Sequence, residues 1–225
     1  MTKEVFGSQR LLQIAVNSRP ELVASALKRS GAVGRREEIS WLSPLAQNTY
    51  AEYRDGAALS KLGITQLLNH PLATFWPSRG CVWDGLALAS GRPVLVEAKA
   101  HIPEAVSPPS KATSTASADL IAASLGQARR FYGPRGRTTW GAQFYQYTNR
   151  LAYQYFLREK NAIASSLVFL YFTNATDMDG PTTEQEWHGA VRLMHAVLGI
   201  PPDLSRYGVH HAFMDARQLL SLIHI

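Results

Sequence analysis

The sequence has a single cysteine and no long uninterrupted run of apolar residues. One thiol, at Cys81, excludes a disulfide within the chain and a zinc site built from several cysteines. Polar and charged side chains repeatedly break the first 27 residues, which therefore predict neither a signal peptide nor a membrane span. No later segment reaches the roughly 18 apolar residues that a span requires. We therefore expect a soluble, cytoplasmic protein with no membrane partner.

Acidic residues are also fewer than basic ones. The 225 residues include 17 Asp and Glu against 23 Lys and Arg, which gives a formal net charge of +6. An excess of positive charge favours a polyanionic partner such as nucleic acid. The length and the 46% hydrophobic content predict one domain over residues 1–225, with no internal repeat and no separate recognition domain. A homodimer is compatible with these features, and the sequence leaves the oligomeric state open.

The most informative stretch lies between residues 82 and 101. Two apolar runs separated by Ser, Gly, Arg and Pro predict a β-hairpin. Because side chains alternate along a strand, Glu97 and Lys99 share one face of the second arm. On the first arm, Asp84 takes one face and Trp83 the opposite face.

The length of the hairpin loop decides which charged side chains face each other. A two-residue loop places Asp84 opposite Glu97, whereas a four-residue loop places Asp84 opposite Lys99. A three-residue loop would need a compensating bulge to keep all three on one face. Two opposed carboxylates repel, and a divalent cation held by their oxygens would relieve the repulsion. The alternative is a solvated face of an antiparallel sheet.

Asp84, followed after twelve residues by the run Glu97, Ala98 and Lys99 on the next strand, resembles the signature of the PD-(D/E)XK nuclease superfamily. The residue before the aspartate is Trp83 and not the proline of the signature, which many members also lack. The resemblance implies an α/β fold with a restriction-endonuclease-like core, in which helices flank a mixed β-sheet. Extra helices would lie at both ends of the chain, with an N-terminal helical extension over residues 1–40.

The resemblance also implies an activity, the hydrolysis of phosphodiester bonds in DNA rather than RNA. Asp84, Glu97 and the backbone carbonyl of Ala98 would bind Mg²⁺, for which Mn²⁺ is a possible substitute. Lys99 would orient or help to deprotonate the attacking water and stabilise charge on the phosphorus. The chain would then be a metal-dependent deoxyribonuclease.

Two further site residues are expected from neighbouring helices. Members of the superfamily often contribute an acidic side chain from the helix before the hairpin, and Glu52, within a helix predicted over residues 43–68, resembles it in placement. Glu37 and Glu38 compete for that role, and a solvated helix residue is the other reading of Glu52. Gln127, on the helix after the hairpin, is similar in placement to a residue that supports the attacking water.

The strongest basic feature is a group of four arginines beside an aromatic residue, which could hold phosphates and stack a base. The members of this group are Arg129, Arg130, Arg135, Arg137 and Trp140. A solvated arginine cluster is the alternative. Residues 103–118 are rich in Pro, Ser, Thr and Ala, which predicts a flexible loop that could close over substrate or be an ordinary insertion.

The remaining patterns complete the predicted α/β core. Apolar stripes at helical spacing predict helices, a continuous apolar run predicts a strand buried on both faces, and shorter runs predict outer strands. The helices are predicted over 6–30, 119–132, 143–160, 184–198 and 216–223, the buried strand over 165–173, a first strand or a crossover over 69–80, and a final short strand over 209–215. Two other function classes stay open, a non-catalytic nucleic-acid-binding protein on the same fold and a basic protein-interaction module with an accidental motif.

Overall fold

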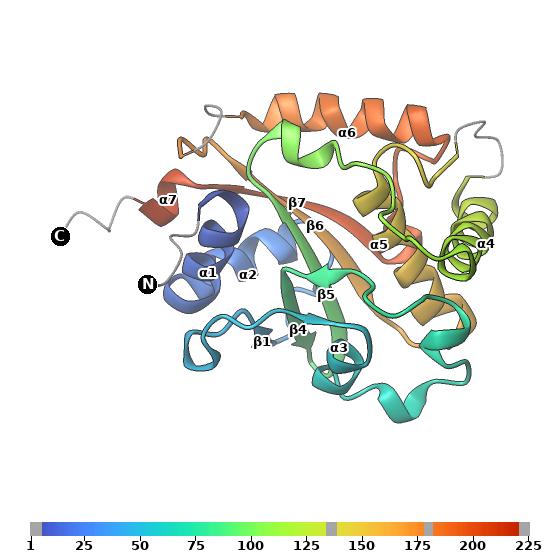
Figure 1. Cartoon of the computed structure of the whole chain (residues 1–225). Helices are drawn as coiled ribbons and strands as arrows, with labels where there is room; N and C mark the ends of the chain where they lie inside the picture. The colour runs from blue at the N-terminus through green and yellow to red at the C-terminus, as the bar shows by residue number, and fades with distance from the viewer. Residues whose placement is uncertain (1–5, 134–138, 178–181, 221–225) are drawn as a thin grey trace.

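The computed structural model describes residues 6–133, 139–177 and 182–220. It is an α/β structure with a mixed five-stranded sheet in the order β1-β4-β5-β6-β7 (Figure 1). The first three strands in that order pair antiparallel, and β5, β6 and β7 pair parallel. These strands are β1 (Ile39–Ser43), β4 (Gly85–Ala89), β5 (Arg92–Lys99), β6 (Ser166–Thr173) and β7 (Val209–Asp215). The predicted mixed sheet flanked by helices is confirmed.

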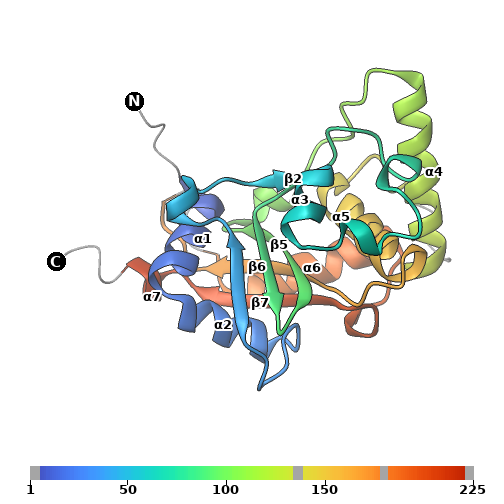
Figure 2. The same cartoon turned by 90° about the horizontal axis from the view of Figure 1, so that it is seen from below.

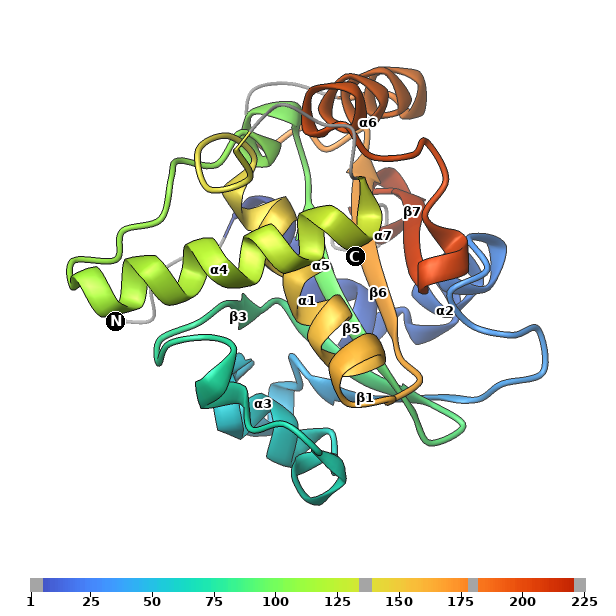
Figure 3. The same cartoon turned by 90° about the vertical axis from the view of Figure 1, so that its right-hand side faces the viewer.

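Helices cover both faces of the sheet (Figures 2 and 3). On one face lie α1 (Gly7–Ser18), α2 (Pro20–Arg29) and α7 (Arg217–Leu220). On the other lie α3 (Asp55–Lys61), α4 (Thr115–Tyr132), α5 (Tyr145–Tyr155) and α6 (Glu184–Leu198). None of the described helices has the length and hydropathy needed to cross a bilayer.

Short elements connect these layers. A turn of π-helix follows α5, and a second, two-stranded sheet pairs β2 with β3. The short elements are β2 (Tyr53–Arg54), β3 (Val82–Trp83), the π-helical turn Phe156–Lys160 and the 3-10 helices Ala46–Asn48, Thr65–Leu67, Leu72–Thr74, Ile102–Ala105 and Ser205–Tyr207.

The β4–β5 hairpin has the two-residue loop, one of the two lengths that the sequence left open. Ala89 pairs with Arg92, and the register continues to Gly85 opposite Val96. Ser90 and Gly91 have φ values of 46° and 87°, the left-handed conformations that match the twist of a tight hairpin. The pairing ends there, and Asp84 and Glu97 are the next residues beyond this last pair.

Strand β6 lies between β5 and β7, and all eight of its residues are buried. Its side chains alternate between two apolar clusters, one under each helical layer. Phe169, for example, belongs to the cluster under α5 and α6, whereas Val168 and Leu170 belong to the cluster under α1 and α2. A strand buried on both faces reads as a continuous apolar run, and the prediction over residues 165–173 is confirmed.

The helix predicted over residues 43–68 is wrong for most of its length. Ser43 ends β1, and Thr49 and Tyr50 have φ values of 51° and 56°, which no right-handed helix can contain. Only the seven residues of α3 and a 3-10 turn are helical after that point. Of the two alternatives for residues 69–80, the strand is wrong, because a 3-10 helix and irregular chain occupy that segment.

Trp83 lies on the opposite face of the sheet from the one predicted, because the first arm of the hairpin is interrupted at Asp84. Before this point the chain turns away from β5 and pairs with β2, so that Trp83 lies opposite Tyr53. The Trp83 ring is 1% exposed and packs edge-on against Tyr153 of α5, with the centroids 5.3 Å apart. The interruption resets the alternation of side chains, and Trp83 joins the cluster under α5.

Candidate active site

Asp84, Glu97 and Lys99 meet at the carboxyl end of β5, on the face of the sheet that α4 and α5 cover. Asp84 Oδ2 accepts a hydrogen bond from the backbone N–H of Ala98, at 2.8 Å. Lys99 Nζ lies 2.6 Å from Glu97 Oε1. The structure therefore brings together the three side chains that the sequence grouped, and the backbone of Ala98 lies beside them.

Arg150 of α5 completes this cluster. Its Nε and Nη2 atoms lie 2.7 and 2.6 Å from Glu97 Oε2, and its side chain is 5% exposed. Nη2 also donates to the Val82 carbonyl, and Nη1 donates to Asn149 Oδ1. The guanidinium lies over the Trp83 ring, 4.8 Å from its centroid. Arg150 thus uses its planar fork of donors on several fixed partners at once.

The four charges set one another's protonation. Burial, and next the negative charge of Glu97, raise the pKa of Asp84 to about 7. Burial acts to raise the pKa of Glu97 as well, but the adjacent Arg150 and Lys99 outweigh it and lower that pKa. Burial acts to lower the pKa of Lys99, yet Glu97 and Asp84 raise it. Glu97 is therefore held ionised beside two cations, while Asp84 titrates near neutral pH.

The cluster opens into a cavity of about 960 Å³. Asp84, Glu97, Lys99 and Arg150 line it, together with two further cations, Arg79 and Lys111. With two carboxylates and several cations in its lining, the cavity suits a ligand that carries phosphate and can share a divalent cation with the carboxylates.

The predicted flexible loop over residues 103–118 forms one wall of this cavity. It begins in a 3-10 helix and ends in the first turn of α4, and residues 107–114 between them have no regular structure. Ser107 Oγ accepts the backbone N–H of Gln146, at 2.8 Å, which ties the loop to the start of α5. The loop therefore lies beside Lys99 in space as well as in sequence.

Glu104 is an acidic residue of the cavity that the sequence did not single out. Its Oε2 accepts the backbone N–H of Ala100 at 2.7 Å, and its Oε1 lies 3.6 Å from His101 Nδ1. Because these contacts use the carboxylate to hold the end of β5, Glu104 has a structural task that local sequence patterns do not reveal.

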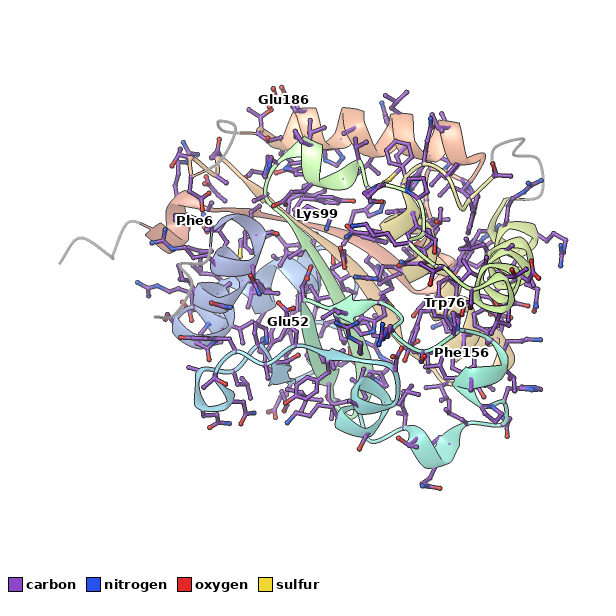
Figure 4. All side chains as sticks on the ribbon, in the orientation of Figure 1. Phe6, Glu52, Trp76, Lys99, Phe156 and Glu186 are labelled. Atoms are coloured by element: carbon purple, nitrogen blue, oxygen red, sulfur yellow. The ribbon has the colours of Figure 1, made fainter. Side chains whose placement is uncertain are left out.

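Glu52 lies near the cluster but not on a helix. It belongs to the connection before β2, and its Oε1 accepts a hydrogen bond from Gln9 at 2.7 Å. The pKa of Glu52 is raised. Burial, the largest influence, and the charge of Glu97 outweigh the hydrogen bond from Gln9 and the charge of Arg150, which act to lower it. Figure 4 labels Glu52 and Lys99 in the central part of the molecule. Glu52 therefore interacts electrostatically with Glu97 and Arg150 but does not line the cavity.

The competing residues Glu37 and Glu38 lie at the other end of β5. Glu37 Oε2 accepts the N–H of Gly34 and pairs with Arg92, 2.8 Å away, beside the hairpin turn. The Glu38 N–H lies 3.3 Å from Ser90 Oγ, also at the turn. Because β5 runs its whole length between Arg92 and Lys99, neither carboxylate reaches the cluster.

The other predicted site residues do not converge on the cavity. Gln127 lies on α4 but is not among the residues that line it. Arg129 lines a smaller neighbouring cavity of about 290 Å³, and Arg130 is exposed. Trp140 is 2% exposed and donates its indole N–H to the Leu198 carbonyl, which leaves no open ring face for stacking. The remaining two arginines, Arg135 and Arg137, fall outside the described residues.

The residues present at the cluster suit a divalent cation. Among the described side chains no group of three or more His, Cys, Asp and Glu residues forms a complete cage. Mg²⁺ does not need one, because it is typically held by one or two carboxylates together with water and phosphate. Asp84 uses only Oδ2 in hydrogen bonds within the described chain. The Ala98 carbonyl faces the same strand edge as its N–H, because both backbone groups of a strand residue point to one side.

Comparisons with known proteins return no relative for this chain. No protein-family model matches it, and no curated protein or solved structure is significantly similar to it. The function must therefore be inferred from the geometry and chemistry of the site.

Proposed function

We propose that this protein is a metal-dependent nuclease on a restriction-endonuclease-like core, with DNA as its substrate. The observation that carries the proposal is the convergence of Asp84, Glu97 and Lys99 at one end of β5, in a cavity that further cations line. An acid pair beside a lysine is the set of groups needed to hold a divalent cation and to stabilise charge on a phosphate.

Each residue has a distinct task in this proposal. Asp84, Glu97 and the Ala98 carbonyl would hold Mg²⁺ or Mn²⁺, which when bound supplies Lewis-acid chemistry at a phosphate oxygen. Lys99 would hold the attacking water through its ammonium and stabilise the charge that develops on the phosphate. Arg79 and Lys111, which line the same cavity, would bind flanking phosphates and would not read the base sequence.

Lys99→Ala tests the proposal. We expect the variant to lose at least about a hundredfold in cleavage of plasmid DNA in Mg²⁺, because the ammonium that stabilises the developing charge is gone. Binding of the same DNA in EDTA, measured by fluorescence anisotropy, should be retained. Unchanged cleavage would remove Lys99 from the mechanism.

Lys28→Ala is the matched control. Lys28 lies on α2, on the opposite face of the sheet, so its loss removes the same charge without touching the cavity. We expect cleavage by this variant to stay at the wild-type level. If the wild-type protein binds DNA but cuts neither DNA nor RNA in Mg²⁺ or Mn²⁺, the chain is a non-catalytic binding protein.

A further inference from the structure

The carboxylate of Glu97 is shared between two cations that differ in their freedom to move. Oε2 faces Arg150, which contacts it through Nε and Nη2. Oε1 faces Lys99, which contacts it through Nζ alone. The two oxygens of one carboxylate therefore have separate partners.

Arg150 cannot move away from Glu97 Oε2 without losing several other contacts. Its fork is held by the Val82 carbonyl at 2.7 Å and by Asn149 Oδ1 at 2.8 Å, and the Trp83 ring lies beneath it. With the side chain 5% exposed, water has little access to replace these partners. A buried arginine that loses its carboxylate partner is strongly destabilised.

Lys99 has no comparable restraint. Its contact with Glu97 is its one ion pair within the described chain, and its side chain is 13% exposed toward the cavity. An ammonium on a flexible four-carbon stem can move to a new partner at small cost. Glu97 Oε1 is thus the oxygen that the site can offer to another cation.

We infer that Arg150 is a positioning residue that fixes Glu97 through Oε2, so that Oε1 exchanges Lys99 for the divalent cation. This inference rests on the proposed function and adds to it a coupling between cation binding at Glu97 and the release of Lys99. While Oε1 holds Lys99, the ammonium lines the cavity but is engaged by the carboxylate. With a divalent cation bound at Oε1, Lys99 would be free to contact a phosphate and its attacking water in the cavity.

The exchange predicts a result that a lysine acting only in catalysis would not give. If Lys99 and the cation compete for Oε1, then Lys99→Met should bind Mn²⁺ about tenfold more tightly than the wild-type protein while losing cleavage. Mn²⁺ binding is measured without DNA, by the loss of the free-ion electron paramagnetic resonance signal on titration. The readout is therefore independent of activity.

Lys111→Met is the matched control for charge alone. Lys111 lines the same cavity but makes no ion pair with Glu97, so its removal changes the long-range potential and leaves Oε1 occupied. We expect its Mn²⁺ affinity to stay within about threefold of the wild type.

Three outcomes would count against the inference. Equal Mn²⁺ affinity in Lys99→Met and wild type, or equal tightening in both lysine variants, would overturn the exchange and leave the nuclease proposal standing. Absence of Mn²⁺ binding in every protein, with Asp84→Asn as the negative reference, would overturn both.

Discussion

At the scale of single residues, the site depends on one buried ion pair between distant parts of the chain. Glu97 is 2% exposed and Arg150 is 5% exposed, so neither charge is compensated by bulk water. Isolated buried charges are costly, and a pair is tolerated only when the geometry and the remaining hydrogen bonds are good. Arg150 meets this condition through Val82 and Asn149.

A double-mutant cycle measures this dependence. Arg150→Met should lower the free energy of unfolding by about 3–5 kcal/mol, because Glu97 stays buried with one partner fewer. Glu97→Gln combined with Arg150→Met should cost less than the sum of the two single variants, with a coupling of about 2 kcal/mol. Urea denaturation of the four proteins supplies these values.

The pair between Glu37 and Arg92 is the control for that cycle. Both side chains are about a quarter exposed, and their atoms lie 2.8 Å apart. Solvent screens such a pair, so we expect its coupling energy to stay below about 1 kcal/mol. Similar coupling in both pairs would show that burial does not set the strength of the Arg150 contact.

At the scale of elements, local rules account for the turn of the hairpin and for α6. Gly91 has a φ of 87°, where a side chain is strained even though no atom lies within 4 Å of the position that Cβ would take. Gly189 also has open space at Cβ but lies in the interior of α6, which begins with a capping box from Thr183 to Glu186. The two glycines therefore differ in backbone conformation and not in available space.

Alanine at these two positions should have opposite effects. Gly91→Ala should lower the free energy of unfolding by about 1–2 kcal/mol, because the left-handed conformation disfavours a Cβ atom. Gly189→Ala should raise it by about 1 kcal/mol, because alanine is the better helix former. Thermal unfolding followed by circular dichroism distinguishes the two. Effects of the same sign would contradict the backbone explanation.

The same local rules explain which elements were predictable. The strand over 165–173 is a continuous apolar run and the helix over 184–198 has strong apolar periodicity, and both form where the sequence places them. Residues 43–68 have apolar side chains at helical spacing too, but outside the short α3 they form strand, 3-10 turns and irregular chain. Their apolar side chains pack against distant elements, and such long-range packing outweighs weak local propensity.

At the scale of the whole molecule, a largely buried network joins three elements, α5, α6 and β7. His195 of α6 donates from Nδ1 to the Pro201 carbonyl, so its Nε2 accepts the hydroxyl proton of Tyr147, 2.7 Å away. The Tyr147 oxygen then accepts from His211 of β7, at 3.0 Å. The acceptor role of Nε2 requires the His195 imidazole to be neutral, whereas His211 can donate from Nε2 in either protonation state. Burial lowers the pKa of His195 to about 4 and that of His211, which also lies beside other histidines, to about 3.

The neutral network predicts how stability depends on pH. Below about pH 6.5 the unfolded chain binds protons at both histidines while the folded chain does not, so these two residues contribute a loss of stability as the pH drops toward 4, opposite in sign to the contribution of Asp84, whose pKa is raised in the folded chain. For His195 alone the loss amounts to roughly 3 kcal/mol. We expect urea denaturation at pH 6.5 and pH 4 to show that His211→Gln, which lacks one of the two histidine contributions, loses less stability over this interval than the wild type.

His188→Gln controls for the loss of a histidine as such. His188 lies on α6 with its side chain 57% exposed. An equal reduction of the loss in this variant and in His211→Gln would contradict the assignment of the pH dependence to the buried network.

The sequence by itself determined the α/β class, the hairpin and the alternation that puts Glu97 and Lys99 on one face of β5. These features follow from local periodicity and turn chemistry, which act over a few residues. Tertiary structure decided that Arg150 is the partner of Glu97 and that Trp140 belongs to the core. Residues 97 and 150 belong to different elements, and the packing of α5 against the sheet, which no short pattern encodes, places their charges together.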